Sequence, residues 1–307
     1  MKRFIVALLL AACGIAAAQT QAPKPEPEQS QDATQLSTMG SDKGLSPTYS
    51  DTYCAGFVTK EKYDPSNYVK GDIAPDISRT AARGIVFLSG TGYTVGSRYS
   101  VVRLSKDANK FEIFPGQNAM LNHMGNLYAD IGRVRVTRLE NNIAVADVEF
   151  SCEPLVIGDT VIPFAPRPRP AYRTEKVTFQ RFADFDGAPS GRIIMGKGFE
   201  DFVGTGQKVY INIGSEKGLK PGDYLRITRG YDPKGMPPVE KLSMQAPYSE
   251  DSQKNPKHTK PSGGKSTPWR GVGELMVLST TPTTATGIIT TALEDIHLGD
   301  VVETQSK

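Results

Sequence analysis

The chain has 307 residues, with 36 lysine and arginine residues against 33 aspartate and glutamate residues. Lys2 and Arg3 belong to a predicted leader, so the remaining net charge is close to zero and gives no long-range attraction for nucleic acid. No apolar run reaches the roughly 18 residues of a membrane-spanning helix, which excludes a polytopic membrane protein.

The chain begins with the pattern of a secretory signal peptide. Met1–Arg3 is a short basic segment and Phe4–Ala12 is an unbroken apolar stretch, so we expect an exported, periplasmic protein. Two processing routes remain open. Ala16–Ala18 before Gln19 fits ordinary signal peptidase and predicts a leader of residues 1–18. Cys13 lies in a Leu-Ala-Ala-Cys-Gly sequence that resembles the lipobox of bacterial lipoproteins, which predicts lipidation at Cys13 and an outer-membrane lipoprotein. We favour soluble release, because apolar residues continue beyond the cysteine.

Residues 19–50 are rich in Gln, Pro, Ser, Thr and charge, and we interpret them as a disordered tether. The run from Pro163 to Pro170 alternates proline with arginine, favours extended polyproline II, and lies between two matching halves. We therefore predict a first β domain over 51–165, a proline-rich linker over 166–186 that holds its flanks apart, and a second β domain over 187–304 with a long insertion at 230–270. A docking ligand is the alternative interpretation of the basic proline-rich run.

Cys54 and Cys152 are the two cysteines that remain after the leader. In an oxidising compartment an isolated pair most simply forms one disulfide, and two buried free thiols are the alternative. We expect both cysteines to occupy slots that the other half fills with apolar residues, namely Pro189 and Leu293. The bridge would hold the first strand of the first domain to its next-to-last strand.

An internal repeat is the strongest signal in the sequence, and its four blocks occur in the same order in both halves. The longer blocks align Tyr93–Arg103 with Leu219–Arg229, and Ile131–Val161 without a gap with Val272–Val302. The shorter blocks align Val86-Phe87-Leu88 with Val209-Tyr210-Ile211, and Gly56-Phe57-Val58 with Gly191-Arg192-Ile193. A duplication explains this order.

Each half is predicted to be β. Short runs rich in β-branched and aromatic residues alternate with glycine turns, which favours an all-β fold of two tandem small barrels or sandwiches with about five or six strands each. In the second half we predict strands at 209–213, 224–228, 275–278, 285–291 and 300–303, and residues 119–128 offer at most one short helical turn. Asp223 is expected to cap its own turn. The residues predicted to shape turns are Gly96, Gly158, Asp159, Gly214, Gly218, Gly222, Asp223, Gly299 and Asp300.

The repeat motifs resemble a known family. The pattern G-S-x-x-G-L-x-x-G-D-x-L-x-I at Gly214–Ile227, with V-G-E-L-x-V at Val272–Val277 and H-L-G-D-V-V at His297–Val302, resembles the C-terminal domain of flagellar assembly protein T. The first half, with Tyr93–Tyr99, Gly125–Gly132 and Ile157–Asp159, is similar to the β module that follows a LysM domain in secreted peptidoglycan-binding proteins. The resemblance implies an envelope β module used for assembly or contact.

Catalytic and metal-binding patterns are incomplete. Gly264–Ser266 resembles the end of a phosphate-binding loop, but Thr259 stands where the first glycine is required. Ser262–Lys265 has Ser-x-x-Lys spacing, but its two central glycines oppose the helix that this motif needs. Asp295 and His297 are a conceivable metal pair, and a valine at the repeat position of His297 favours a packing or solvent-facing role. We therefore predict no enzyme, no cofactor and no metal site.

Residues 230–270 depart from the repeat and insert a segment far longer than ordinary hairpin loops. Its second half is locally basic, which suggests a contact arm for an anionic glycan, lipid headgroups or a partner. The candidate residues of this arm are Lys254, Lys257, Lys260, Lys265, Trp269 and Arg270. The alternative, which we favour, is a solvated, disordered loop with Trp269 packed on the barrel rim.

Two function hypotheses follow. The first is a non-enzymatic, exported cell-envelope protein that acts as a scaffold or protein-contact module for envelope protein partners. The alternative is a peptidoglycan, glycan or small-ligand binding module of the periplasm, with the ligand in the crevice between the halves or on the basic arm. A hydrolase is disfavoured because no nucleophile has a base at usable spacing. Nucleic acid is not an expected partner, and membrane contact is expected only through a lipid anchor.

Overall fold

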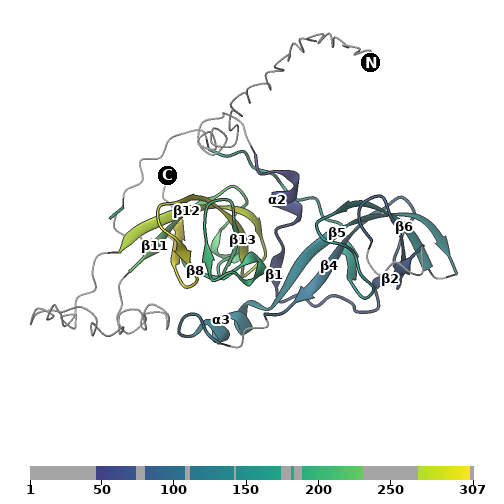
Figure 1. The fold of residues 1–307 in the computed structure, drawn as a ribbon, viewed down its shortest axis with the longest axis horizontal. Helices are drawn as coiled ribbons and strands as arrows, with labels where there is room; N and C mark the ends of the chain where they lie inside the picture. Colours follow the sequence, from purple (N-terminus) through teal and green to yellow (C-terminus); the bar gives the residue numbers. More distant parts are fainter. Residues whose placement is uncertain are drawn as a thin grey trace, which may run out of the picture. The chain divides into compact units, whose positions relative to one another are not determined.

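The computed structural model describes residues 46–73, 80–107, 111–141, 143–173, 181–182, 189–230 and 269–304. These residues form two closed six-stranded antiparallel β-barrels, which confirms the predicted all-β fold of two tandem barrels (Figure 1). The predicted signal peptide, the predicted processing sites at Cys13 and Gln19, and most of the predicted tether lie outside the described residues.

The first barrel closes around a core of small and β-branched side chains. Along one strand Ala144, Ala146 and Val148 are buried in alternation, as expected when successive side chains point to opposite faces. Its strands are β2 (Tyr68–Asp72), β3 (Ile85–Ser89), β4 (Arg98–Ser105), β5 (Asn126–Glu140), β6 (Ile143–Ser151) and β7 (Thr160–Pro163). They pair in the order β5-β4-β7-β2-β3-β6, and β6 pairs with β5 to close the barrel.

The second barrel repeats this topology. Its strands are β8 (Ser190–Gly196), β10 (Lys208–Ile211), β11 (Tyr224–Arg229), β12 (Arg270–Thr280), β13 (Ala285–Ala292) and β15 (Val301–Thr304). They pair in the order β12-β11-β15-β8-β10-β13, so each strand has a counterpart in the first barrel. All five strands predicted in this half are present. Two short 3₁₀ turns, η1 (Lys197–Phe199) and η2 (Ser215–Lys217), and a two-stranded sheet of β9 (Phe202–Val203) and β14 (Ile296–His297) complete it.

Three of the four predicted repeat blocks coincide with equivalent strands, and the fourth does not. Ile193 of β8 accepts the Gly299 N–H through its carbonyl and donates its own N–H to Asp300 O, whereas in the first barrel Val69 makes these two bonds with Gly158 and Asp159. The counterpart of Ile193 is therefore Val69 of β2 and not Val58, so the predicted match of Gly56–Val58 with Gly191–Ile193 is wrong. A three-residue match carried too little information to set the offset.

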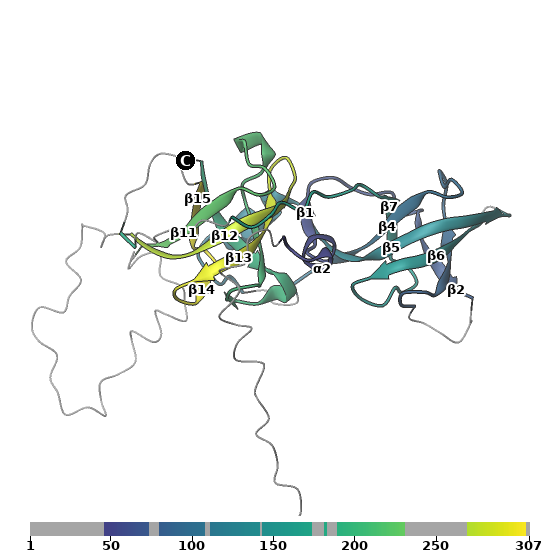
Figure 2. The same ribbon diagram turned by 90° about the horizontal axis from the view of Figure 1, so that it is seen from above.

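A segment before the first barrel contacts both barrels. It contains α2 (Tyr49–Tyr53) and β1 (Phe57–Thr59), and we call residues 46–59 the strap. In Figures 1 and 2, α2 and β1 lie between the two barrels. The Thr48 hydroxyl accepts the Asp51 N–H and the Asp51 carboxylate accepts the Thr48 N–H, which forms a capping box at the start of α2. The predicted end of the tether at residue 50 is therefore too late.

One helix interrupts the first barrel. α3 (Gln117–Met124) lies in the connection between β4 and β5, and it is longer and begins earlier than the short turn predicted within residues 119–128. Gly116 and Gly125 flank it with φ angles of +84° and +108°. A Cβ atom at Gly125 would lie 2.2 Å from the Thr59 carbonyl oxygen, so only glycine allows β1 to approach the helix end.

The predicted linker is anchored to both barrels and is not a free spacer over its described residues. The Arg167 guanidinium donates to both carboxylate oxygens of Asp130 in β5, at 2.7 Å each. Arg173 pairs with the buried Glu274 of β12, and its guanidinium lies 4.2 Å from the centre of the Tyr224 ring. The prolines extend this segment while its arginines bind, so the expectation that it holds its flanks apart is wrong.

Cys54 and Cys152 form the predicted disulfide, with their Cα atoms 5.5 Å apart. Cys54 ends α2 in the strap and Cys152 follows β6, so the bridge ties the strap to the first barrel. The predicted reason is wrong. Leu293, the repeat counterpart of Cys152, is 48% exposed, and Pro189 was matched to Cys54 only through the incorrect upstream block.

Replacement of both cysteines by serine is expected to lower the melting temperature. The bridge spans 98 residues, and chain entropy gives at most about 4.7 kcal/mol for a loop of about 100 residues. Thermal unfolding of Cys54→Ser/Cys152→Ser against the native chain measures the effect. Titration of the unfolded, unreduced mature protein should find no free thiol, and two reactive thiols would contradict the bridge.

Candidate functional site

Each barrel contains the same pair of an arginine and a buried aspartate. Arg103 at the end of β4 donates to the two carboxylate oxygens of Asp159 at 2.7 and 2.9 Å. Arg229 at the end of β11 donates to those of Asp300, at 2.7 Å each. The aspartate side chains are only 2% and 4% exposed. The hydrogen bonds to Asp159 raise the pKa of the Arg103 guanidinium, so the pair holds its charge.

The same carboxylates also close a turn. Asp159 accepts the Val156 N–H at 2.8 Å, and Asp300 accepts the His297 N–H at 2.9 Å. A glutamate adds a weaker contact in each barrel: Glu153 lies 3.3 Å from Arg103, and Glu294 lies 3.9 Å from Arg229. Hydrogen bonds from Arg270 lower the pKa of Glu294. Asp159 and Asp300, which were predicted as turn residues, thus connect a turn to a neighbouring strand.

The predicted turn glycines fall into two kinds. Gly96, Gly158, Gly218, Gly222 and Gly299 have positive φ angles between 84° and 96°. Gly214 is extended, and a Cβ atom there would lie 2.3 Å from the Thr281 carbonyl oxygen, so close backbone approach requires the glycine. Asp223 accepts the Lys220 N–H at 2.8 Å, which is the turn cap that the sequence predicts.

The strap binds the second barrel through its backbone carbonyls and through the burial of Ala55 and Val58. The Tyr210 hydroxyl donates to Ala55 O at 2.8 Å, the Thr286 hydroxyl to Gly56 O at 3.0 Å, and the Thr284 hydroxyl to Val58 O at 2.6 Å. Burial raises the pKa of the Tyr210 phenol, which therefore keeps the proton that it donates. Asp51 of α2 adds an ion pair with Lys208 of β10, with 2.6 Å between Oδ1 and Nζ. The sequence carried no local signal for these contacts.

α3 also packs on the second barrel. The Gln117 amide donates to the Ile194 carbonyl of β8 at 3.0 Å. Met124, Phe114 and Leu127 are buried in one core cluster with residues of the second barrel. The prolyl-glycine before α3 and the glycine after it were the sequence signals that would have delimited this helix.

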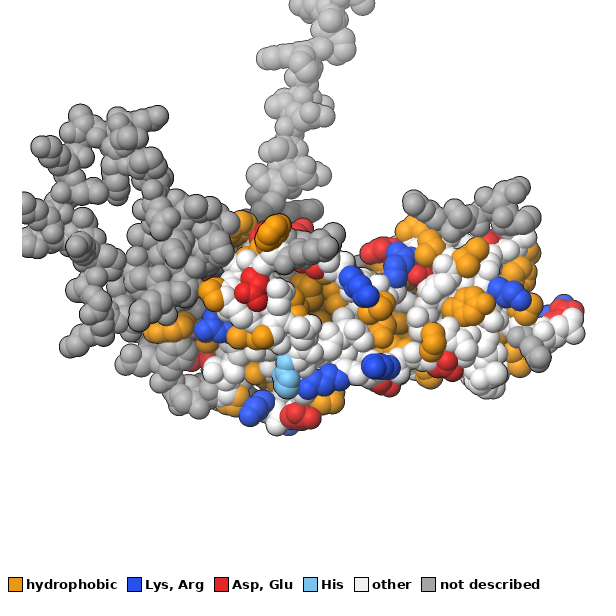
Figure 3. Space-filling model, turned by 90° about the horizontal axis from the view of Figure 1, so that it is seen from below, with side chains coloured by type: hydrophobic (Ala, Val, Ile, Leu, Met, Phe, Trp, Pro, Cys, Tyr) orange, Lys and Arg blue, Asp and Glu red, His pale blue; other side chains and the backbone are white. Residues whose placement is uncertain are grey.

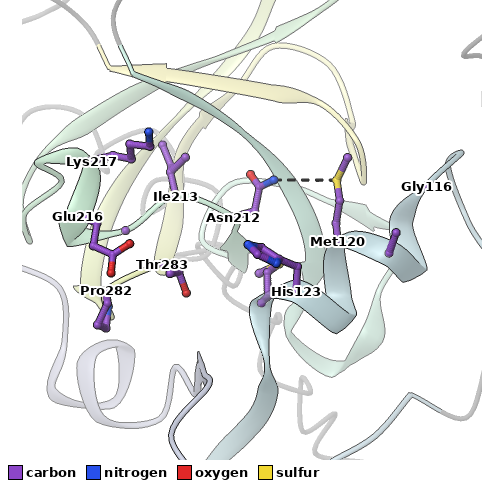
Figure 4. Close-up of a pocket in the computed structure, with 12 residues that line it drawn as sticks. Gly116, Met120, His123, Asn212, Ile213, Glu216, Lys217, Pro282 and Thr283 are labelled. Carbon is purple, nitrogen blue, oxygen red and sulfur yellow. Dashed lines mark hydrogen bonds between the residues drawn. The ribbon is translucent and has the colours of Figure 1, made fainter.

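A pocket of about 530 Å³ lies where α3 meets the second barrel. α3 and its preceding glycine form one wall, and the segment around η2 with the turn between β12 and β13 forms the other (Figure 4). Its lining residues are Gly116, Ala119, Met120, His123, Met124, Asn212, Ile213, Gly214, Glu216, Lys217, Pro282 and Thr283. The Asn212 amide faces the sulfur of Met120, with 3.9 Å between Nδ2 and Sδ. This pocket was not predicted, although a crevice between the halves was.

Most of the candidate contact arm lies outside the described residues, including Lys254, Lys257, Lys260 and Lys265. Trp269 and Arg270 lie within the described residues, where Trp269 packs against the backbone at Gly230 and Arg270 forms an ion pair. A Cβ atom at Gly230 would lie 2.6 Å from the Trp269 ring, and Arg270 pairs with Glu294 at 2.9 Å. The arm as a binding element therefore stays a prediction.

The other candidate groups have local roles or lie outside the described residues. The His297 ring packs edge-on against Phe202, with 4.8 Å between ring centres, and the carbonyl of Asp295 accepts from Arg229. Gly264–Ser266 and Ser262–Lys265 are not among the described residues. In the described part of the chain, no group of three or more His, Cys, Asp and Glu side chains is placed to hold a metal ion.

A comparison with protein-family models and with curated proteins finds no match. The resemblance to flagellar assembly protein T and to LysM-associated modules therefore stays a prediction. None of the helices in the described ranges has the length and apolar character needed to cross a membrane.

Replacement of Asp300 by alanine is expected to destabilise the protein by about 3–5 kcal/mol, because the mostly buried Arg229 loses its partner. Asp159→Ala is expected to cost less, because the Arg103 side chain is 34% exposed and water can solvate it. Asp201→Ala is the matched control, since the Asp201 side chain is exposed, and we expect a change within about 0.5 kcal/mol. Denaturant unfolding gives these free energies. Equal losses in the variants and the control would show that the pairs do not support the barrels.

Proposed function

We propose that this protein is a non-enzymatic, exported cell-envelope protein that acts as a scaffold or protein-contact module. One observation carries the proposal: each buried carboxylate of the described residues pairs with an arginine. The pairs are Asp130 with Arg167, Asp159 with Arg103, Asp300 with Arg229, Glu274 with Arg173, and Glu303 with Arg226. A carboxylate that pairs with an arginine in this way has its charge compensated within the fold, which supports a structural role for the buried charge.

The contacts between the barrels support the same proposal. A scaffold has to present more than one surface from a single folded body. The strap hydrogen bonds and the core cluster shared by α3 and the second barrel connect the two barrels through the strap and α3. Buried hydrogen bonds and apolar contacts of this kind are typical of a lasting intramolecular interface.

The surface charge supports a protein partner in preference to a polyanion. On the face shown in Figure 3, basic and acidic side chains are intermixed and hydrophobic side chains are scattered between them. Polyanions favour a basic stripe on one face, whereas protein interfaces tolerate mixed charge.

A peptidoglycan, glycan or small-ligand binding module is the second candidate. The observation that favours it is the pocket beside α3, because its volume of about 530 Å³ lies within the range of known small-ligand sites.

Affinity capture from an envelope extract, run beside peptidoglycan sedimentation, tests both functions with the mature chain from Gln19. We expect the bait to recover defined envelope proteins in stoichiometric amounts and to stay in the supernatant with peptidoglycan. Sedimentation that survives salt washing, with no recovered protein partner, would contradict the proposed contact function.

If the protein sediments with peptidoglycan, two variants show which of its surfaces is responsible. Replacing residues 231–268 with Asn-Gly removes the predicted arm, and the register pair Arg229 and Arg270 allows a short hairpin there. Ala119→Tyr fills the pocket, and Asn118→Tyr is its control because Asn118 is exposed on α3 outside the pocket lining. The glycan-binding function predicts loss of sedimentation in one of the first two variants and not in the control.

The intact mass of the mature protein tests its anchorage. Soluble release predicts a chain that begins at Gln19, without added lipid, in the periplasmic fraction. A detergent-extracted chain that begins with a diacylglyceryl Cys13 would establish the lipoprotein route and exclude soluble release.

A further inference from the structure

The pocket wall formed by α3 contains three side chains that can bind soft metal ions. Met120, His123 and Met124 follow the spacing i, i+3 and i+4, and all three line the pocket. Residues three and four apart lie beside each other on a helix, with Cβ atoms about 5–6 Å apart. One helix therefore places two thioether side chains and one imidazole along the same pocket wall.

This donor set selects one class of metal. Thioethers are soft ligands that favour Cu(I), and imidazole also suits copper, whereas magnesium and calcium require oxygen ligands. Zinc sites are built from thiolate, imidazole and carboxylate ligands. The described residues contain no group of three such side chains placed to hold a zinc ion. The methionine pair therefore makes this pocket selective for Cu(I) over zinc.

The three side chains differ in their burial and in their hydrogen bonds. Met120 is half-buried, and its sulfur faces only the Asn212 amide, at 3.9 Å. A thioether is a weak hydrogen-bond acceptor, so an ion can replace this contact with little loss. His123 is exposed and makes no hydrogen bond within the described residues, so its ring is free to turn toward the sulfurs. Met124 is 2% exposed and closes the inner end of the pocket.

The opposite wall does not repel a cation. Glu216 and Lys217 lie across the pocket from α3 and carry opposite charges (Figure 4). The unbranched methionine side chains adapt to a ligand by changing rotamer, without movement of the helix backbone. A monovalent ion with two or three protein ligands fits these conditions better than a divalent ion with a strict geometry.

We propose that Met120, His123 and Met124 bind one soft monovalent cation, Cu(I), in the pocket between α3 and the second barrel. Packing against the core of the second barrel accounts for the positions of both methionines, but it does not account for an exposed histidine beside two thioethers on the same pocket wall. The site does not depend on the scaffold function.

Ag(I), which is redox-inert and has the same ligand preference, is the probe. The mature chain from Gln19 suits this test, because both of its cysteines are in the disulfide and no thiol competes for silver. Calorimetric titration is expected to show one Ag(I) per chain. Met120→Leu/Met124→Leu is expected to abolish this binding, and His123→Asn to weaken it by roughly tenfold or more.

Met195→Leu/Met276→Leu is the matched control, because both methionines are buried outside the pocket. Leucine conserves the volume of methionine, so both double variants are expected to fold. In the native chain, NMR of ¹³C-methyl methionine should show shifts at Met120 and Met124 on addition of Ag(I), which makes the test independent of variant stability. Zn²⁺ should cause no such shifts. Absence of Ag(I) binding, equal binding by both double variants, or shifts at other methionines would overturn the proposal.

Discussion

Both barrels depend on a buried aspartate that pairs with an arginine at the end of the third strand. Asp159 and Asp300 stand before the last strand of their barrels, and each carboxylate binds both a turn N–H group and a guanidinium. The turn and the third strand are thereby fixed together, with Val102 opposite Thr160 in one barrel and Thr228 opposite Val301 in the other. A shift in this register would leave a charge buried without a partner, which costs several kcal/mol.

The two copies share this framework but differ in what connects their third and fourth strands. Gly132 and Gly273 are equivalent, and a Cβ atom at either would lie 2.6 or 2.5 Å from a carbonyl oxygen of the neighbouring strand. The framework therefore tolerates little change. The connection from β4 to β5 carries α3, which packs on the second barrel, whereas the connection from β11 to β12 is the long insertion that begins at Gly230 and ends at Trp269. These two connections, which differ most visibly in structure, lie away from the turn that fixes the strand register.

The sequence predicted the strands because their signals are local and occur in both halves. Glycine turns and alternating apolar residues showed the strands of the second half correctly, whereas the disulfide, which occurs once, was predicted from the presence of an isolated cysteine pair. The strap was missed because its bonds join residues far apart in sequence: Tyr210 and Ala55 are separated by 155 positions. The three-residue match at Gly56 even assigned part of the strap to the barrel. Arg167 looked like a solvated linker residue, and only the fold reveals Asp130 as its partner.

The strap also determines how the two barrels respond to a load on the chain before Thr48. Such a load enters at α2 and divides between two attachments of different strength. The attachment to the first barrel includes the covalent Cys54–Cys152 bond. The attachment to the second barrel consists of the Asp51–Lys208 ion pair, hydrogen bonds to strap carbonyls, each worth about 0.5–1.5 kcal/mol, and the packing of Ala55 and Val58 into buried clusters of that barrel. All of these contacts are noncovalent. We therefore expect the second barrel to separate from the strap before the first barrel, which the disulfide keeps joined to it.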